Sequence, residues 1–198
     1  MNLQILDKAE NFVVEEDRRL TLYGVSWEKY EIIRDTLDEF SGLKMIYLEG
    51  TLEFFMPGAK HEGIKKLIAR LVELYCLEKN IRLYASGSTT YRKKAKERGL
   101  ELDESYSIGE SKELPDFAIE VIITSGSISL LEVYKGLGVP EIWFWKNDRL
   151  SLYYLQGEKY ELIEKSNFLP ELDIELLVRC ANIPDQHDAV VEFRNAIR

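Results

Sequence analysis

The segment "LPDFAIEVIITS", residues 114–125, decides how this chain folds. Its apolar side chains are typical of a buried strand, and Glu120 lies in their middle. Side chains alternate along a strand, which places Phe117, Ile119 and Val121 on one face and Asp116, Ala118, Glu120 and Ile122 on the other. A buried charge is costly unless it is paired, protonated or bound to a metal. Glu120 therefore needs either an ion-pair partner or a functional site.

The segments after this strand indicate a crossover. Residues 127–138, "SISLLEVYKGLG", predict a short helix that ends at Gly138. Residues 140–148, "PEIWFWKND", predict another buried strand. A strand, a short helix and a second strand favour a βαβ unit. The next strand follows a turn near Asn147 and Asp148, which predicts a hairpin.

The remaining elements predict an α/β or α+β fold, with a mixed central sheet flanked by helices. Helices are expected over residues 26–42, 61–80 and part of 169–198. A hairpin with its turn at Glu49 and Gly50 is expected over residues 43–58. Single strands are expected over residues 81–92, 100–109 and 149–165. The length of 198 residues suits one domain, 1–198, in which 166–198 forms a C-terminal helical appendage.

Composition narrows the class of protein. No apolar run reaches the ~20 residues of a membrane helix, and no secretory signal opens the chain, so we expect a cytoplasmic protein. The two cysteines are expected to be small buried hydrophobes. The net charge of -9 argues against a nucleic-acid coat protein. It leaves room for an enzyme with a local basic patch, such as "YRKKAKERG", residues 91–99, which otherwise is a solvated loop or helix end.

Two carboxylates form the candidate site. In "LELDES", Asp103 shares a strand face with Glu101 and Ser105. If this strand pairs with the Glu120 strand, Asp103 and Glu120 lie side by side. Their repulsion is relieved either by a divalent cation such as Mg²⁺ or Mn²⁺, or by basic neighbours from "YRKK".

An ordered set of motifs carries a family resemblance: "GLELDESYSIG", "LPDFAIEVIITSGS" and "YKGLGVPEIWFW", preceded by "YLEGTLEFFMPGAKHEGIKKLI". Over about residues 26–155 the chain resembles the Uma-type family of restriction-endonuclease-like proteins, in the PD-(D/E)xK nuclease superfamily. The resemblance implies hydrolysis of DNA phosphodiester bonds with Mg²⁺ or Mn²⁺. It places Asp103 and Glu120 as metal ligands and Glu62 as support for the metal or its water, with Asp116 as a lesser candidate.

The chain departs from the superfamily at the lysine that follows the glutamate. Ile122 stands at the usual position, and Leu130 stands where related sequences carry the lysine on the next helix. Lys135 is turned by about 140° from that position. The cation must then come from elsewhere, for instance from "YRKK", or the site is inactive. An endonuclease and a catalytically inactive nuclease fold that binds nucleic acid or protein both remain open, and a homodimer is compatible with either. His61 is either a surface or helix-entry residue or a neighbour of a phosphate or metal.

Overall fold

The computed structural model describes residues 15–37, 40, 42–87 and 89–198, so most of the segment used to judge a secretory signal lies outside the described residues. The strands are β1 (Arg18–Tyr23), β2 (Lys44–Leu48), β3 (Thr51–Met56), β4 (Leu83–Ala85), β5 (Thr90–Lys93), β6 (Arg98–Glu101), β7 (Glu104–Ile108), β8 (Phe117–Ile122), β9 (Glu141–Lys146), β10 (Arg149–Gln156) and β11 (Lys159–Ile163). The helices are α1 (Trp27–Leu37), α2 (Ala59–Glu78), α3 (Leu130–Leu137), α4 (Ile174–Ala181) and α5 (Gln186–Ile197), with a 3-10 turn at Lys94–Lys96.

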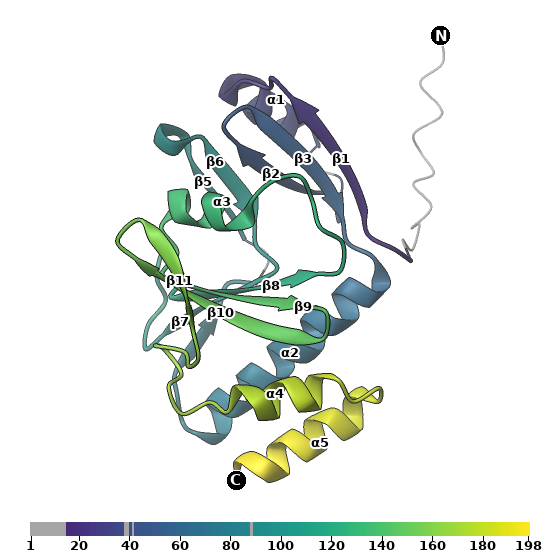
Figure 1. Cartoon of the computed structure of the whole chain (residues 1–198), viewed down its shortest axis with the longest axis vertical. Coiled ribbons are helices and arrows are strands. Elements are labelled where there is room, and N and C mark those ends of the chain that lie inside the picture. The colour runs from purple at the N-terminus through teal and green to yellow at the C-terminus, as the bar shows by residue number, and fades with distance from the viewer. Residues whose placement is uncertain (1–14, 38–39, 41, 88) are drawn as a thin grey trace.

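The strands form two sheets (Figure 1). The first has the order β1-β3-β2-β6-β5 and is antiparallel throughout. The second has the order β11-β10-β9-β8-β7-β4, in which β8 and β9 are parallel and the other pairs antiparallel. Helix α3 connects β8 to β9, so the predicted βαβ crossover is confirmed.

Helices cover both faces of the second sheet (Figure 1). Phe117, Ile119 and Val121 pack in the core formed with α2, α4 and α5. Ala118 and Ile122 point to the other face and pack against α3 and residues of β6. The predicted alternation along β8 is thus confirmed, and the molecule has the α+β architecture expected of a restriction-endonuclease-like domain.

Both predicted tight turns are confirmed. In the β2–β3 hairpin Leu48 pairs with Thr51, and the turn residues Glu49 and Gly50 have φ of 42° and 85°. Asn147 and Asp148, between β9 and β10, have φ of 51° and 58°. Positive φ at both central residues gives the turn whose twist matches that of the flanking strands.

The single strand predicted over residues 100–109 is wrong. The chain leaves the first sheet after β6, crosses at Leu102 and Asp103, and enters the second sheet as β7. Residues 81–92 likewise divide into β4 and β5, and residues 149–165 into the hairpin β10–β11. A crossing between sheets leaves the alternation of polar and apolar residues intact, so the pattern alone does not reveal it.

Two further expectations concern burial and membranes. Cys76 and Cys180 are buried free thiols, as predicted. Among the described residues, no helix combines the length and apolar character that crossing a bilayer requires.

Candidate active site

The crossing between the sheets brings Asp103 against β8. β7 pairs with β8 in the register Glu104 to Ile119, which sets Asp103 opposite Glu120. The Asp103 amide donates to Glu120 Oε1 at 3.2 Å, and the Val121 amide donates to Asp103 Oδ2 at 2.8 Å. Both carboxylates are buried, with exposures of 1% and 6%. The two acids therefore lie side by side, although the strand that carries Asp103 is interrupted there.

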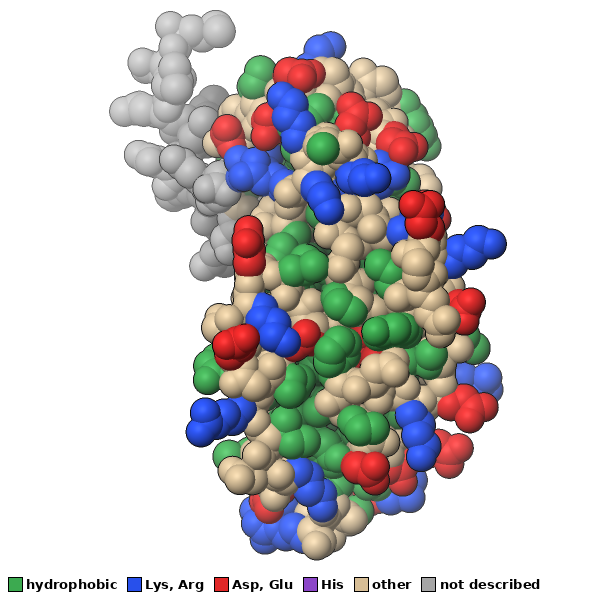
Figure 2. Space-filling view, turned by 90° about the vertical axis from the view of Figure 1, so that its left-hand side faces the viewer, with side chains coloured by type: hydrophobic (Ala, Val, Ile, Leu, Met, Phe, Trp, Pro, Cys, Tyr) green, Lys and Arg blue, Asp and Glu red, His purple; other side chains and the backbone are tan. Residues whose placement is uncertain are grey.

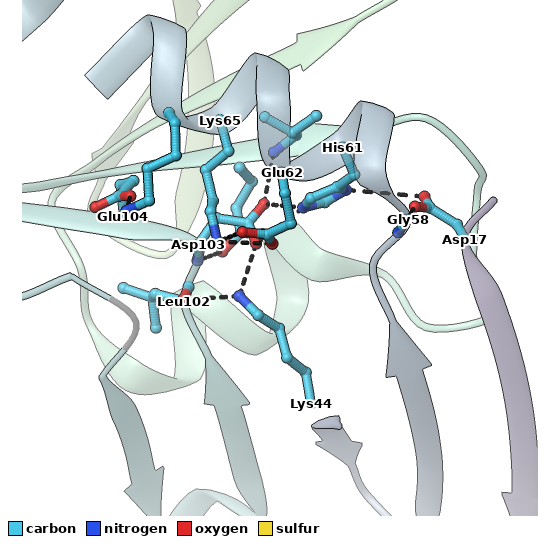
Figure 3. Close-up of polar contacts among 12 residues, drawn as sticks. Asp17, Lys44, Gly58, His61, Glu62, Lys65, Leu102, Asp103 and Glu104 are labelled. Atoms are coloured by element: carbon cyan, nitrogen blue, oxygen red, sulfur yellow. Dashed lines mark hydrogen bonds and ion pairs between the residues drawn. The ribbon is translucent and has the colours of Figure 1, made fainter. Parts of the chain in front are cut away.

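Lys44 supplies a cation to this pair from β2 (Figure 3). Its Nζ lies 2.7 Å from Asp103 Oδ1 and donates to the carbonyl of Leu102 at 3.1 Å. Two basic residues of the "YRKK" segment have other partners: Arg92 pairs with Glu31 at 3.5 Å and Lys94 with Glu28 at 3.8 Å. The resident cation of the site is thus a lysine that sequence reasoning did not consider.

His61, near the start of α2, also contacts the Asp103 carboxylate (Figure 3). Its Nε2 lies 3.0 Å from Asp103 Oδ2, and its Nδ1 lies 3.8 Å from Asp17 Oδ2. Asp17 in turn accepts a hydrogen bond from the Gly58 amide at 2.9 Å. The ring packs edge-on against Phe55 and is 1% exposed. His61 is therefore a buried part of the site at the helix entry.

The two carboxyl groups have opposite electrostatic environments. Burial disfavours the charge of Asp103, but Lys44 and His61 outweigh that cost and hold the Asp103 pKa well below its usual range. Burial, together with the charge of Asp103, raises the pKa of Glu120 to about 8, against the opposing effects of Lys44 and the Tyr134 hydroxyl. Burial also opposes the charge of Lys44, yet Asp103 and Glu120 raise its pKa. Lys44 thus pairs directly with Asp103, whereas burial and the charge of Asp103 act together against the ionised form of Glu120.

The other candidate residues, Glu62, Asp116 and Lys135, form ion pairs of their own, apart from Asp103 and Glu120. Glu62 is 41% exposed at its side chain and pairs with Lys65 at 2.7 Å. Asp116 accepts from the Ile108 amide at 2.8 Å and pairs with Lys112, so the structure gives it a different set of partners. Lys135 pairs with Glu132.

A small cavity, here called the carboxylate cavity, lies beside the two acids. Its volume is about 10 Å³, and its lining includes Lys44, Asp103, Glu120 and Leu130. That is about the volume that a single water requires. Leu130, at the position of the missing lysine, therefore faces the acids without a charge.

The donor set suits a hard divalent cation. Mg²⁺ is held by one or two carboxylates and completes its shell with waters and substrate phosphate oxygens. Within the described chain no group of three His, Cys, Asp or Glu gathers as a metal site, so the protein would supply two carboxylates here. Both hydrogen bonds that the described residues make to Glu120 go to Oε1, which leaves Oε2 for a ligand. A bound cation would stabilise the ionised form of Glu120, which burial and the charge of Asp103 disfavour.

The register of one hairpin gives the sheet face on which Lys44 lies, but not its partner. The turn at Glu49 and Gly50 pairs residue 44 with residue 55, so Lys44 and Phe55 must share a face of the first sheet. Nothing in the local sequence says that this face meets β8, and the pairing of Lys44 with Asp103 was therefore hidden.

The charged side chains on the face of the molecule shown in Figure 2 do not form a broad basic surface. Lys and Arg side chains there are interspersed with Asp and Glu around a central stretch of hydrophobic side chains. With a net charge of -9, any attraction of this protein for a polyanion has to be local.

The comparisons with known proteins bear on the family and the fold. A search of curated proteins returns no match. The model of the Uma2 family, described as "Putative restriction endonuclease", matches residues 27–183, which include every residue of the carboxylate pair and Lys44. This confirms the resemblance carried by the sequence motifs and indicates a nuclease-like function. The chain belongs to the Uma2 family.

Proposed function

We propose that this protein is a divalent-metal-dependent endonuclease that hydrolyses phosphodiester bonds in DNA. The observation that supports it is the convergence of Asp103, Glu120 and Lys44, from three separate segments, on one buried point. Two acids and a lysine are the charged groups of a PD-(D/E)xK site. Here the lysine comes from β2 in place of the position two residues after Glu120.

Each residue has a role that follows from its contacts. Asp103 and Glu120 bind the cation, and Lys44 stabilises negative charge that develops on the phosphate. His61 fixes the Asp103 carboxylate, and the hydroxyl of Tyr134 donates to Glu120 and fixes its orientation. When bound, Mg²⁺ or Mn²⁺ polarises a phosphoryl oxygen and lowers the pKa of an attacking water.

Cleavage of supercoiled plasmid in Mg²⁺ or Mn²⁺ tests this proposal. Asp103→Asn and Glu120→Gln keep the side-chain shapes and remove the charges, so each is expected to lose metal-dependent cleavage and metal binding by calorimetry. Asp116→Asn is the matched control, because its partners are Lys112 and the Ile108 amide. Full metal-dependent cleavage by the Asp103→Asn/Glu120→Gln double variant contradicts the proposal.

A second function, a catalytically inactive nuclease fold that binds nucleic acid or protein, also has an observation in its favour. Lys44, His61 and the Val121 amide already satisfy Asp103, and the apolar Leu130 lines the cavity. Purified protein with Mn²⁺ would then leave single-stranded, double-stranded and supercoiled DNA intact while shifting one of them in a gel. Turnover that both Asp103→Asn and Glu120→Gln abolish excludes this alternative.

A further inference from the structure

A surface pocket adjoins the carboxylate cavity at the carboxyl ends of the parallel strands. We call it the β8–α3 pocket. It has a volume of about 230 Å³, and its lining includes Arg19, Glu53, Thr124, Ser125, Leu130 and Lys146. Arg19 and Leu130 also line the carboxylate cavity, so they form the wall that the two spaces share. The β8–α3 pocket is therefore the solvent-facing neighbour of the buried acids.

A row of residues across the first sheet explains how Arg19 comes to this wall. Arg19 of β1 pairs with Phe55 of β3, and Phe55 pairs with Lys44 of β2. Cross-strand partners point to the same side, and neighbouring strands are about 4.8 Å apart. Arg19 and Lys44 therefore flank Phe55 on one face, and the guanidinium carbon of Arg19 lies 3.8 Å from the centre of the Phe55 ring. Lys44 contacts Asp103, and Arg19 lines both the carboxylate cavity and the β8–α3 pocket.

The polar groups of the pocket are donors suited to a phosphate. The Arg19 guanidinium pairs with Glu53 through Nη1 and contacts the Thr124 hydroxyl through Nε at 3.4 Å, so that among the described residues Nη2 makes no such contact. Lys146, the last residue of β9, is exposed and donates to the Ser125 hydroxyl at 3.1 Å. Arginine and lysine are the side chains that bind phosphate groups best, arginine through paired N–H bonds.

Glu53 holds this pocket in shape. Its buried carboxylate accepts from the Ser127 amide at 2.8 Å and the Ser127 hydroxyl at 3.1 Å, besides its ion pair with Arg19. A Cβ on Gly126 would lie 2.2 Å from Glu53 Oε1, so the loop after β8 can approach the carboxylate this closely only with glycine there. Glu53 thus fixes Arg19 and the part of the loop at Ser127.

The volume of the pocket points to part of a larger ligand. Pockets for whole small molecules start at about 300 Å³, above the volume found here. A backbone phosphate of a nucleic acid needs only a local site, because the rest of the polymer lies outside it. Ligands of parallel sheets also bind outside the carboxyl ends of the strands, where this pocket lies.

We propose that Arg19 and Lys146, with the hydroxyls of the loop after β8, bind a backbone phosphate of DNA and so place the neighbouring phosphodiester bond at Asp103 and Glu120. This assignment rests on the proposed nuclease function, and it adds a substrate-binding site that is separate from the cation site. Arg19 and Lys146 are positioning residues, because they hold the DNA and do not touch the reacting atoms.

The salt dependence of DNA binding tests the site. Fluorescence anisotropy measures the binding of a short labelled duplex in Ca²⁺ across a series of salt concentrations. Each phosphate contact contributes about 0.9 to the slope of log K against log salt, so Lys146→Ala and Arg19→Gln should each lower the slope by about 1. Lys159→Ala on β11 is the matched control, because Lys159 is exposed and does not line the pocket.

Three results overturn the assignment, and one of them also refutes the nuclease function. If both pocket variants keep the wild-type slope of log K against log salt, the phosphate site is refuted, whereas the proposed nuclease function is not. If millimolar inorganic phosphate raises the melting temperature of the wild type but not of Lys146→Ala, while both pocket variants keep the wild-type slope for DNA, the pocket binds free phosphate instead. If the wild type neither binds nor cleaves any DNA at low salt, both the phosphate site and the proposed nuclease function are refuted. Arg19→Gln removes the ion-pair partner of the buried Glu53, so the folding of this variant is checked by thermal melts. If Arg19→Gln is unfolded, the slope measured for Lys146→Ala, a substitution of an exposed side chain, decides the test.

Discussion

Replacing Lys44 by methionine should destabilise the protein strongly. Methionine keeps most of the apolar stem but removes the ammonium, which lies 2.7 Å from Asp103 and donates to the Leu102 carbonyl. The side chains of the pair are only 6% and 1% exposed, so solvent screens the interaction little. Removing one partner of a buried ion pair leaves an uncompensated charge and costs about 3–5 kcal/mol. At about 2–4 °C per kcal/mol for a chain of this size, the melting temperature should fall by about 6–20 °C.

A double-mutant cycle in urea identifies the cause of this loss. Asp103→Asn removes the charge that Lys44 compensates, so the Lys44→Met/Asp103→Asn variant should lose less than the sum of the single losses. The exposed control Lys159→Met should change stability by no more than about 0.5 kcal/mol. Mn²⁺ should raise the melting temperature of Lys44→Met more than that of the wild type, because the acids then lack their resident cation. A loss below about 1 kcal/mol for Lys44→Met, or additive losses in the cycle, refutes the assignment of Lys44 as that cation.

Three further variants probe the site and its surroundings. Glu120 has a raised pKa of about 8, so the folded state holds a proton that the unfolded state releases near pH 4.5. The free energy of unfolding should therefore fall as pH rises from about 4.5 to about 8, by at most about 1.4 kcal/mol per pH unit. Urea titrations at several pH values should show that Glu120→Gln removes this fall. Gly126→Ala should cost about 1–3 kcal/mol in the same assay, because its Cβ would collide with the Glu53 carboxylate, and an unchanged midpoint would show that the loop can move away. Leu130→Lys should leave plasmid cleavage within a few-fold of wild type if Lys44 already supplies the lysine, whereas a gain of about 10²-fold would show that the wild-type site lacks its cation.

Local sequence patterns predicted much of the fold. The alternation in residues 117–122, the short helix that follows and the buried strand after it sufficed to predict the parallel crossover, because side-chain period and connection length are local properties. The turns at Glu49–Gly50 and Asn147–Asp148 were predictable for the same reason, since they need residues that accept positive φ. The proximity of Asp103 and Glu120 followed from pairing two strands in register.

The sheet crossing at Asp103 and the identity of its partners were decided by tertiary structure. Residues 100–109 alternate as one strand would, but the hydrogen bonds of β6 go to β2 and β5 and those of β7 go to β4 and β8. Lys44 is 59 positions before Asp103, and Arg19 reaches the same face only because β1 joins the edge of the first sheet. Local sequence determined which residues form strands and turns, whereas the packing of one sheet against the other determined which charges meet, because a buried carboxylate is stabilised by whatever cation the fold brings within a few ångströms.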